Sequence, residues 1–311
     1  MDGKQLRTQY KEHLSDFNNW NQKEHAEDFI LYPKNIGYHL CIDETALSKG
    51  ELYTILTNRD KHGRKCTIVA IVKGTKAEDV INVLLKIDAD KRNQVKEITL
   101  DMAGSMQKIA KRCFPGAMQV VDRFHVSKLV YEAVQDLRIA YRWQVMKDEN
   151  RKIKEAKAKG ESYEPKVFGN GDTLRQLLAG SRYLLFKAPD KWLQSRKVRA
   201  KLLFEQFPDI KSVYYYALRL GKIFSDYTDK DVARAKLALW YNEIEEFGYD
   251  TFTTVANSIE NHYERILNYF VNRSTNAAAE AFNAKIKAFR ASFRGVVDKR
   301  FFLYRLAKVY A

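Results

Sequence analysis

The pattern of apolar and polar positions divides the chain into a β-rich part and a helical part. From residue 37, three runs rich in β-branched and aromatic residues follow one another, and polar turns containing glycine separate them. These runs cover residues 37–44, 51–60 and 64–74. Because the turns between them are short, the pattern predicts an antiparallel meander of three strands.

Beyond residue 75 the spacing of apolar positions alternates between helix and strand. Residues 76–88 have helical spacing, residues 95–101 a strand pattern, residues 102–114 helical spacing again, and residues 117–122 a last strand pattern. The order β-β-β-α-β-α-β predicts a mixed five-stranded α/β sheet, in which crossover helices join the later, parallel strands.

After Asp122 the pattern is almost wholly helical. Residues 124–160 predict a long charged helix or a pair of helices, and amphipathic segments follow, with interruptions at Pro189, Pro208 and Gly248. A final helix begins near Ser274. We therefore expect a helical arm over 1–36, an α/β core over 37–130, an all-α insertion over 131–270, and a last helix with a basic tail over 271–311 that completes the core.

Three of the predicted strands end on aspartate, at Asp43, Asp101 and Asp122. Binding sites of mixed α/β sheets gather beyond the carboxyl ends of parallel strands. Asp43 and Asp101 end strands that we expect to be neighbours, and two carboxylates so close repel each other unless a cation lies between them. Mg²⁺ suits such a pair, and two such ions can hold the attacking and leaving oxygens of a phosphoryl displacement. Each aspartate taken singly also fits a turn former.

Two nearby glutamates differ in what the pattern says of them. Strand alternation points Glu44 to the face opposite Asp43, so we leave it out of the site. Glu280 is the candidate third ligand, because small residues flank it and let its helix pack closely on a sheet. Asn276, Glu280, Asn283 and Lys287 form one polar stripe on that helix. The stripe also fits an ordinary solvated helix face.

Composition adds charge to this picture. The chain has 311 residues, a formal net charge of +15 and a pI near 9.5, which is typical of a protein that meets a polyanion, nucleic acid first. High solubility is the alternative meaning of that charge. Its three cysteines form no CxxC pattern, which argues against a disulfide framework or a zinc site and fits a reducing cytoplasm. The charged start and the short apolar runs predict neither a signal peptide nor a membrane span.

Four segments carry a family resemblance: CIDETALSKGELYTILTN, VKEITLDMAGSMQKIAKRCFPGAMQVVDRFHVSKL, SRYLLFK and RSTNAAAEAFNAKIKAF. The chain resembles bacterial insertion-sequence transposases of the DDE superfamily, which have a ribonuclease-H-like core and, in one group, a long helical insertion before the catalytic glutamate. The resemblance implies that Asp43, Asp101 and Glu280 are the catalytic metal ligands. It implies two Mg²⁺ ions, with Mn²⁺ as a substitute, and metal-dependent DNA cleavage and strand transfer.

The stretch DRFH, residues 122–125, also matches a motif of that family. It implies a role near the site in binding DNA or orienting a ligand. Asp122 is an alternative third carboxylate. His125 fits a general base or, as we favour, a histidine whose hydrogen bonds are satisfied behind the site, since metal-activated water needs no obligatory histidine.

Basic residues predict the DNA contacts. We expect Asn276, Asn283, Lys285 and Lys287 to position DNA or to support the metal ligands. Further contacts to phosphates are expected from Lys191, Arg196, Lys197, Arg199, Lys201, Arg290 and Arg294. The aromatic residues of the tail and Trp143 are expected to pack in the core, although each could instead stack on a base.

The resemblance also concerns partners. Such transposases usually carry an N-terminal zinc-binding or helix-turn-helix region, and residues 1–36 hold no cysteine. We therefore expect a catalytic-half polypeptide or a truncated copy, with end recognition from a separately encoded DNA-binding protein. Joining two DNA ends favours a homodimer, located in the bacterial cytoplasm at the nucleoid. The alternatives are a non-catalytic DNA-binding regulator derived from a transposase, and a ribonuclease-H-like nuclease without strand transfer.

Overall fold

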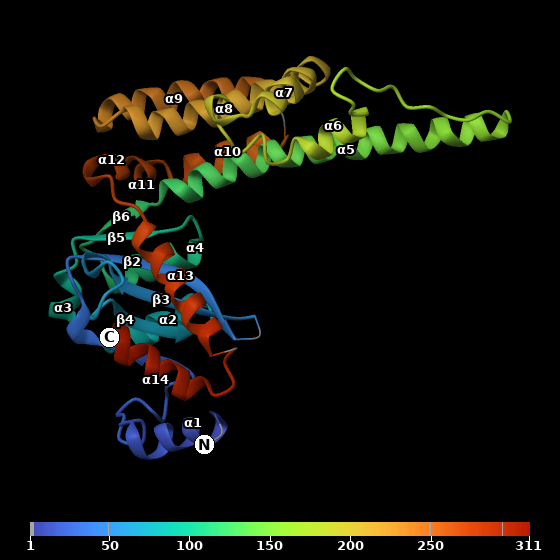
Figure 1. The fold of residues 1–311 in the computed structure, drawn as a ribbon. Helices are drawn as coiled ribbons and strands as arrows, with labels where there is room; N and C mark the ends of the chain where they lie inside the picture. Colours follow the sequence, from blue (N-terminus) through green and yellow to red (C-terminus); the bar gives the residue numbers. More distant parts are fainter. Residues whose placement is uncertain (1–2, 49, 249, 294) are drawn as a thin grey trace. The chain divides into compact units, whose positions relative to one another are not determined.

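The chain divides into two compact units, each of which is described by itself. The computed structural model describes residues 3–48, 50–248, 250–293 and 295–311. The first unit comprises Met1–Asp122 and Glu264–Ala311, and the second comprises Arg123–Tyr263. The first unit is α/β and the second is helical (Figure 1).

Six strands of the described chain form one mixed sheet in the first unit. They are β1 (Phe29–Leu31), β2 (His39–Ser48), β3 (Glu51–Asn58), β4 (Ile68–Lys73), β5 (Glu97–Leu100) and β6 (Met118–Val121). The strand order is β1-β4-β3-β2-β5-β6. Strands β2, β3 and β4 pair antiparallel, whereas β5 and β6 run parallel to β2. The predicted mixed sheet, with its meander and its parallel crossovers, is confirmed.

The sixth strand, β1, lies in the arm that the sequence predicted as helical. It pairs antiparallel with the edge strand β4, with Ile30 opposite Ile71. Ile30 is fully buried in the core. Three residues are too few to give a period-2 pattern, so pairing with β4 determines this strand and local propensity does not.

Helices cover both faces of the sheet. The helical segments of the first unit are α1 (Gly3–Gln9), η1 (Tyr10–Leu14), η2 (Pro33–Asn35), η3 (Arg59–Lys61), α2 (Ala77–Leu84), α3 (Ala89–Asn93), α4 (Gly104–Cys113), α12 (Tyr269–Asn272), α13 (Ala277–Ser292) and α14 (Lys299–Tyr310). On one face, Leu40 and Ile42 of β2 belong to a core with α2 and α4. On the other face, Ile55 packs in a core with Phe282 of α13 and Leu303 of α14.

The aromatic residues of the tail are core residues, as the sequence predicted. Phe301 and Tyr304 of α14 are 3% exposed. Their rings contact Phe17 of the N-terminal arm, with centroids 5.2 and 5.4 Å apart. The arm is therefore held on α14 by an aromatic cluster, and these rings are not free to stack on bases.

Among the described residues, the regular elements of the second unit are all helices, and an isolated β-bridge joins Val167 to Thr173 between α5 and α6. The unit contains α5 (Arg123–Ala158), α6 (Leu174–Gly180), η4 (Pro189–Lys191), α7 (Gln194–Gln206), α8 (Pro208–Asp226), α9 (Lys230–Phe247) and α10 (Asp250–Asn261), and α11 (Tyr263–Leu267) crosses the boundary between the units. Pro208 is the first residue of α8, and Gly248 ends α9 in the left-handed region with φ 70°. The predicted interruptions are confirmed.

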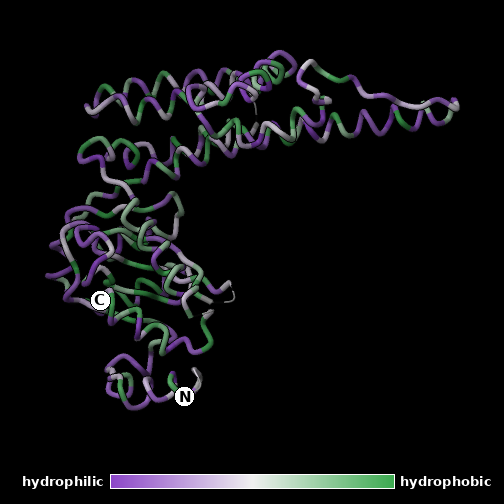
Figure 2. The backbone as a smooth tube through the Cα atoms, in the orientation of Figure 1, coloured by the Kyte–Doolittle hydropathy of each residue, from purple (hydrophilic) through white to green (hydrophobic). Residues whose placement is uncertain are grey.

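Hydropathy along the backbone follows this division. The strands of the first unit are mostly green (hydrophobic) in Figure 2, whereas the C-terminal part of α5 is mostly purple (hydrophilic). No helix in the described part of the chain is both long enough and apolar enough to cross a membrane.

Candidate active site

The pairing of β2 with β5 brings two of the predicted site residues together. The strands run parallel, and Cys41 lies opposite Thr99. Continuing this register by two residues sets Asp43 opposite Asp101, which directly follows β5. Because neighbouring strands lie about 4.8 Å apart, the two aspartates come close at one edge of the sheet. The Sγ of Cys41 and the Oγ1 of Thr99 are 2.8 Å apart, so this face of the two strands is already in side-chain contact.

Asp122 lies at the same level on the next strand. Val121 of β6 is the partner of Leu100, and the N–H of Asp122 donates to the carbonyl of Leu100 at 3.1 Å. The Asp122 side chain is 1% exposed. Asp101 and Asp122 therefore follow the carboxyl ends of β5 and β6 directly, and Asp43 lies level with them on the neighbouring strand β2. The prediction that Asp43 ends its strand was wrong, because β2 continues to Ser48 in its pairing with β3. Figure 1 shows β2, β5 and β6 as neighbours.

Hydrogen bonds fix the carboxylates of Asp43 and Asp101. Oδ1 of Asp43 accepts from the N–H of Glu44 at 2.8 Å, and Oδ2 accepts from Nδ2 of Asn283 at 2.7 Å. Oδ1 of Asp101 accepts from the N–H of Ala103 at 2.8 Å. These bonds orient both carboxylates, and a carboxylate oxygen that accepts one hydrogen bond can accept a second interaction.

Negative charge is concentrated at this edge of the sheet. Burial, and behind it the like charges of Asp101 and Asp43, raise the pKa of the Glu44 carboxyl. Burial also raises the pKa of the Cys41 thiol to about 12, and Asp122 and Asp43 act in the same direction. A cation beside Asp43 and Asp101 would relieve this repulsion.

Helix α13 lies on the same face of the sheet as Asp43. Its apolar side packs into the core through Phe282 and Ile286, and the adjacent side presents Asn283 to Asp43. Glu280 lies in the first turn of α13, one turn before Asn283, and is exposed. An acidic residue in a first helical turn is stabilised by the positive end of the helix dipole.

Asn276 precedes the first turn of α13 and is fully buried. Its carbonyl accepts from the N–H of Glu280 at 2.8 Å. In the described part of the chain, neither Oδ1 nor Nδ2 of its side chain has a hydrogen-bond partner. A buried amide of this kind can still donate to or accept from a group that enters the site.

The donor set of this site fits a magnesium ion in part. Mg²⁺ is usually bound through one or two carboxylates plus waters and substrate phosphates, and Asp43 with Asp101 meets that requirement. Among the described residues, no three His, Cys, Asp or Glu side chains lie close enough together to hold a metal ion. Glu280 lies on α13, the helix that bonds to Asp43 through Asn283, and its role as third ligand stays a prediction.

The comparison with known families decides the identity of the chain. A family model described as a transposase, that of the ISL3-type DDE transposases, matches residues 40–306. The chain belongs to this transposase family. The match takes in Asp43, Asp101, the helical second unit and Glu280, so the resemblance seen in the sequence is confirmed. No curated protein matches the chain.

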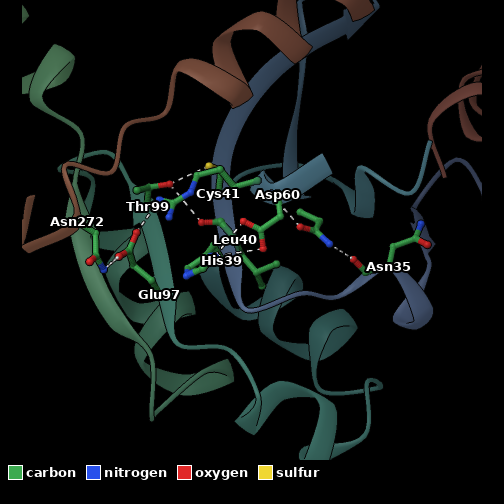
Figure 3. A network of polar contacts seen from close by, with 10 residues as sticks. Asn35, His39, Leu40, Cys41, Asp60, Glu97, Thr99 and Asn272 are labelled. Atoms are coloured by element: carbon green, nitrogen blue, oxygen red, sulfur yellow. Dashed lines mark hydrogen bonds and ion pairs between the residues drawn. The ribbon is translucent and has the colours of Figure 1, made fainter. Parts of the chain in front are cut away.

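The sequence did not predict how this transposase attaches α13 to the sheet. Glu97, at the start of β5, is 1% exposed. Its carboxylate accepts from Nη1 of Arg59 at 2.6 Å and from Nδ2 of Asn272 at 2.8 Å (Figure 3). Burial alone would raise the pKa of Glu97, but these bonds and one from Ser274 outweigh it and lower the pKa. The sequence signal was a glutamate inside an apolar strand run.

A second bond holds the same returning segment. Nδ2 of Asn268 donates to the carbonyl of Gln119 in β6 at 3.0 Å. Asn268 and Asn272 thus bond to the two parallel strands whose ends carry Asp101 and Asp122. They precede α13 directly, and they determine where Glu280 and Asn283 lie along the sheet.

The predicted basic residues differ in their surroundings. Lys191, Lys197, Lys201 and Lys287 are exposed, and Arg196 is half-buried. Arg199 is in a bidentate ion pair with Asp172, at 2.7 and 3.1 Å, which lowers the pKa of that carboxyl.

Two basic residues of α13 bond to backbone carbonyls. Lys285 donates to Gly63 at 2.8 Å, and Arg290 donates to Ala46 and Leu47 at 3.4 Å. Both side chains therefore help to hold α13 on the sheet. Arg294, the last of the predicted DNA contacts, lies outside the described residues.

The DRFH stretch divides between the two units, with Asp122 in the first and His125 in the second. His125 is half-buried in the first turn of α5, and its ring contacts that of Phe124 edge-on. Trp143, in contrast to its predicted place in the core, has 66% of its surface exposed. That prediction was wrong, because apolar positions at helical spacing do not reveal which side of a long helix has neighbours.

Proposed function

We propose that this transposase is a catalytic subunit that cleaves DNA at the ends of an insertion sequence and transfers the freed 3′ ends to target DNA. Asp43, Asp101 and Glu280 are the proposed catalytic and metal-binding residues. The proposal is carried by the parallel pairing of β2 with β5, which sets the two aspartates side by side on the face that α13 covers. Membership of a transposase family supports the same reaction.

Magnesium is the proposed cofactor, with two ions expected and Mn²⁺ as a substitute. Asp43 and Asp101 would hold it, with Glu280 as the third protein ligand. When bound, the cation supplies neutralisation of charge on the carboxylates and on the phosphate oxygens of the substrate. Asp122 remains an alternative third carboxylate, because it follows the next strand at the same level.

The remaining residues of the site orient groups. Asn283 and the N–H of Glu44 fix the two oxygens of Asp43, so this carboxylate needs no reorganisation when a ligand arrives. Asn276 is proposed to bond a ligand or DNA through its buried amide, and His125 to support the site or the DNA. Lys287 and, in the second unit, Lys191, Arg196, Lys197 and Lys201 are the proposed contacts to DNA phosphates.

The proposed reaction implies an oligomeric assembly and a partner protein. Two element ends have to be joined to one target, so a homodimer is the proposed assembly. A separately encoded protein is proposed to recognise the element ends. The place of action is the cytoplasm, at the nucleoid.

A strand-joining assay tests the proposal. Pre-cleaved element ends, target DNA and Mg²⁺ or Mn²⁺ are incubated with the wild type and with Asp43→Asn, Asp101→Asn and Glu280→Gln, and joined products are resolved on gels. Glu44→Gln is the matched control, since it removes a neighbouring carboxylate from the opposite face of β2. We expect joined product from the wild type and the control only.

Other outcomes separate the alternatives. DNA cleavage without joining identifies a nuclease on the same fold, and DNA binding without either reaction identifies a regulator derived from a transposase. Joining that survives Glu280→Gln overturns the assignment of Glu280 as the third ligand. If the wild type is inert alone, the separately encoded end-recognition protein is added before the comparison is repeated.

A further inference from the structure

The second unit contains a buried positive charge that no carboxylate of the described residues balances. Arg138 of α5 is 5% exposed. Its Nε donates to Oε1 of Gln135 at 2.8 Å, and its Nη1 donates to the carbonyl of Leu178 at 2.9 Å. Both acceptors are neutral. Burying a charge without an opposite charge is costly, so the surroundings of Arg138 require an explanation.

The nearest charges are also positive. Arg142 lies one turn further along α5, on the same side of the helix. Arg182 lies beside Gln135, whose Nε2 donates to its carbonyl at 3.2 Å. Burial, and then the charges of Arg142 and Arg182, lower the pKa of Arg138. Within the described part of the chain, none of these three residues forms an ion pair with a carboxylate.

A purely structural role explains only one of the three. Leu178 lies in the last turn of α6, where carbonyl groups carry partial negative charge, so Arg138 also caps that helix. Arg142 has no such partner: its Nε is buried and, in the described residues, makes no hydrogen bond. Arg182 is exposed. Two guanidinium groups therefore remain with unused donors beside a third that is buried.

We propose that Arg138, Arg142 and Arg182 form a phosphate-binding site for the DNA backbone, with Arg142 and Arg182 in contact with the phosphate and Arg138 as buried support. A guanidinium offers paired N–H donors that match two phosphate oxygens. Arg142 also lines an open groove of about 640 Å³, whose wall includes Thr173, Arg175 and the acidic Glu149. This proposal rests on the proposed function in one respect: it takes DNA to be the polyanion that binds to the three arginines.

The test compares the full-length wild type with the double variant Arg142→Gln and Arg182→Gln. Lys152→Gln is the matched control, because Lys152 is exposed on the same helix α5. Dissociation constants for duplex DNA are measured over a series of KCl concentrations without a divalent cation. We expect the double variant to bind roughly tenfold more weakly, with the slope of log K against log salt smaller by about 1 to 2. The control keeps the wild-type slope, because Lys152 lies outside the proposed site.

Thermal unfolding gives a second readout that a structural role would not produce. Without phosphate, the double variant should unfold at a higher temperature than the wild type, because repulsion against Arg138 is removed. Inorganic phosphate should stabilise the wild type and leave the double variant unchanged. A double variant with the wild-type salt slope overturns the proposal, and so does one that unfolds earlier in both buffers. Stabilisation by phosphate with an unchanged salt slope would identify a site for free phosphate and overturn the assignment to DNA.

These outcomes are independent of catalysis. DNA binding and phosphate binding are measured without strand joining, so a chain that joins no DNA can still pass this test. A chain that joins DNA through Asp43 and Asp101 can equally fail it.

Discussion

The buried carboxylate of Glu97 is the clearest single place to test how the fold holds the site together. Glu97→Ala removes the acceptor for Arg59 and Asn272, which lie 2.6 and 2.8 Å from it. Only 16% of the Arg59 side chain is exposed, so water can replace few of the hydrogen bonds that the substitution removes. The substitution therefore leaves a nearly buried guanidinium and an amide without their acceptor.

The magnitude follows from this geometry. Removing one partner of a buried ion pair costs about 3–5 kcal/mol of unfolding free energy, and the residual exposure of Arg59 favours the lower end, about 3 kcal/mol. That is a large part of the roughly 5–15 kcal/mol by which domains are stable. Glu97→Gln keeps the shape and one acceptor but loses the charge, and we expect about 1–2 kcal/mol.

The assay has to read the two units separately, because a chain with two units need not unfold in one step. Native-state hydrogen exchange followed by mass spectrometry does so. Peptides from β5 and α13 should exchange faster in Glu97→Ala, while peptides from α8 and α9 keep the wild-type rate. A loss below about 0.5 kcal/mol, a typical effect of a surface substitution, would refute the reasoning.

The same carboxylate predicts a pH dependence. Burial opposes ionisation, but the bonds from Asn272, Ser274 and Arg59 lower the pKa of Glu97 below its usual value of 4.5. A carboxyl with a lowered folded-state pKa adds stability above its unfolded-state pKa, and this stability is lost as the pH falls through the folded-state value. Glu97→Gln should therefore flatten the loss of stability below about pH 4.5.

Three further substitutions or reactions test other parts of the structure. Iodoacetamide at pH 8 should label the half-buried Cys66 and spare Cys41, whose burial raises its pKa to about 12; peptide mapping that finds Cys41 labelled first would contradict this. Phe282→Ala should cost about 3–5 kcal/mol in urea unfolding, because the ring is fully buried between α13 and the sheet; a loss under 1 kcal/mol would mean that α13 does not pack there. Asp172→Asn should cost about 1 kcal/mol in the second unit and weaken its loss of stability at low pH, since Arg199 lowers the pKa of this carboxyl; an unchanged acid transition would show that the pair is not formed.

The sequence predicted those parts of the fold that local pattern determines. Runs of β-branched and aromatic residues separated by polar turns identified β2, β3 and β4, and the change to helical spacing identified α2 and α4. Asp101 and Asp122 directly follow β5 and β6, as the apolar runs before them predicted, whereas Asp43 lies inside β2, which continues to Ser48. The alignment of Asp43 with Asp101 comes from the parallel register of β2 with β5.

Features that depend on contacts between distant residues were not predictable in this way. β1 forms because Ile30 pairs with Ile71, more than forty residues away along the chain. Glu97 is buried and accepts hydrogen bonds from Arg59 and Asn272, and no pattern in its own segment predicts these two partners. Trp143 has an ordinary helical context, and only the packing of the second unit leaves it exposed.

The sequence predicted which residues of α13 share one side of the helix, but it did not predict what they contact. Asn283 and Glu280 lie on one side of the helix, as their spacing predicted. The structure adds the bond from Asn283 to Asp43. The role of Glu280 as third metal ligand stays a prediction.

The rate of strand joining in a preassembled protein–DNA complex tests the central claim most directly. Under single turnover with Mg²⁺, Asp101→Asn should lower the joining rate by at least about 10³-fold relative to the wild type, while the dissociation constant for DNA changes little. A joining rate within tenfold of the wild type would show that the edge formed by Asp43 and Asp101 is not the catalytic site of this transposase.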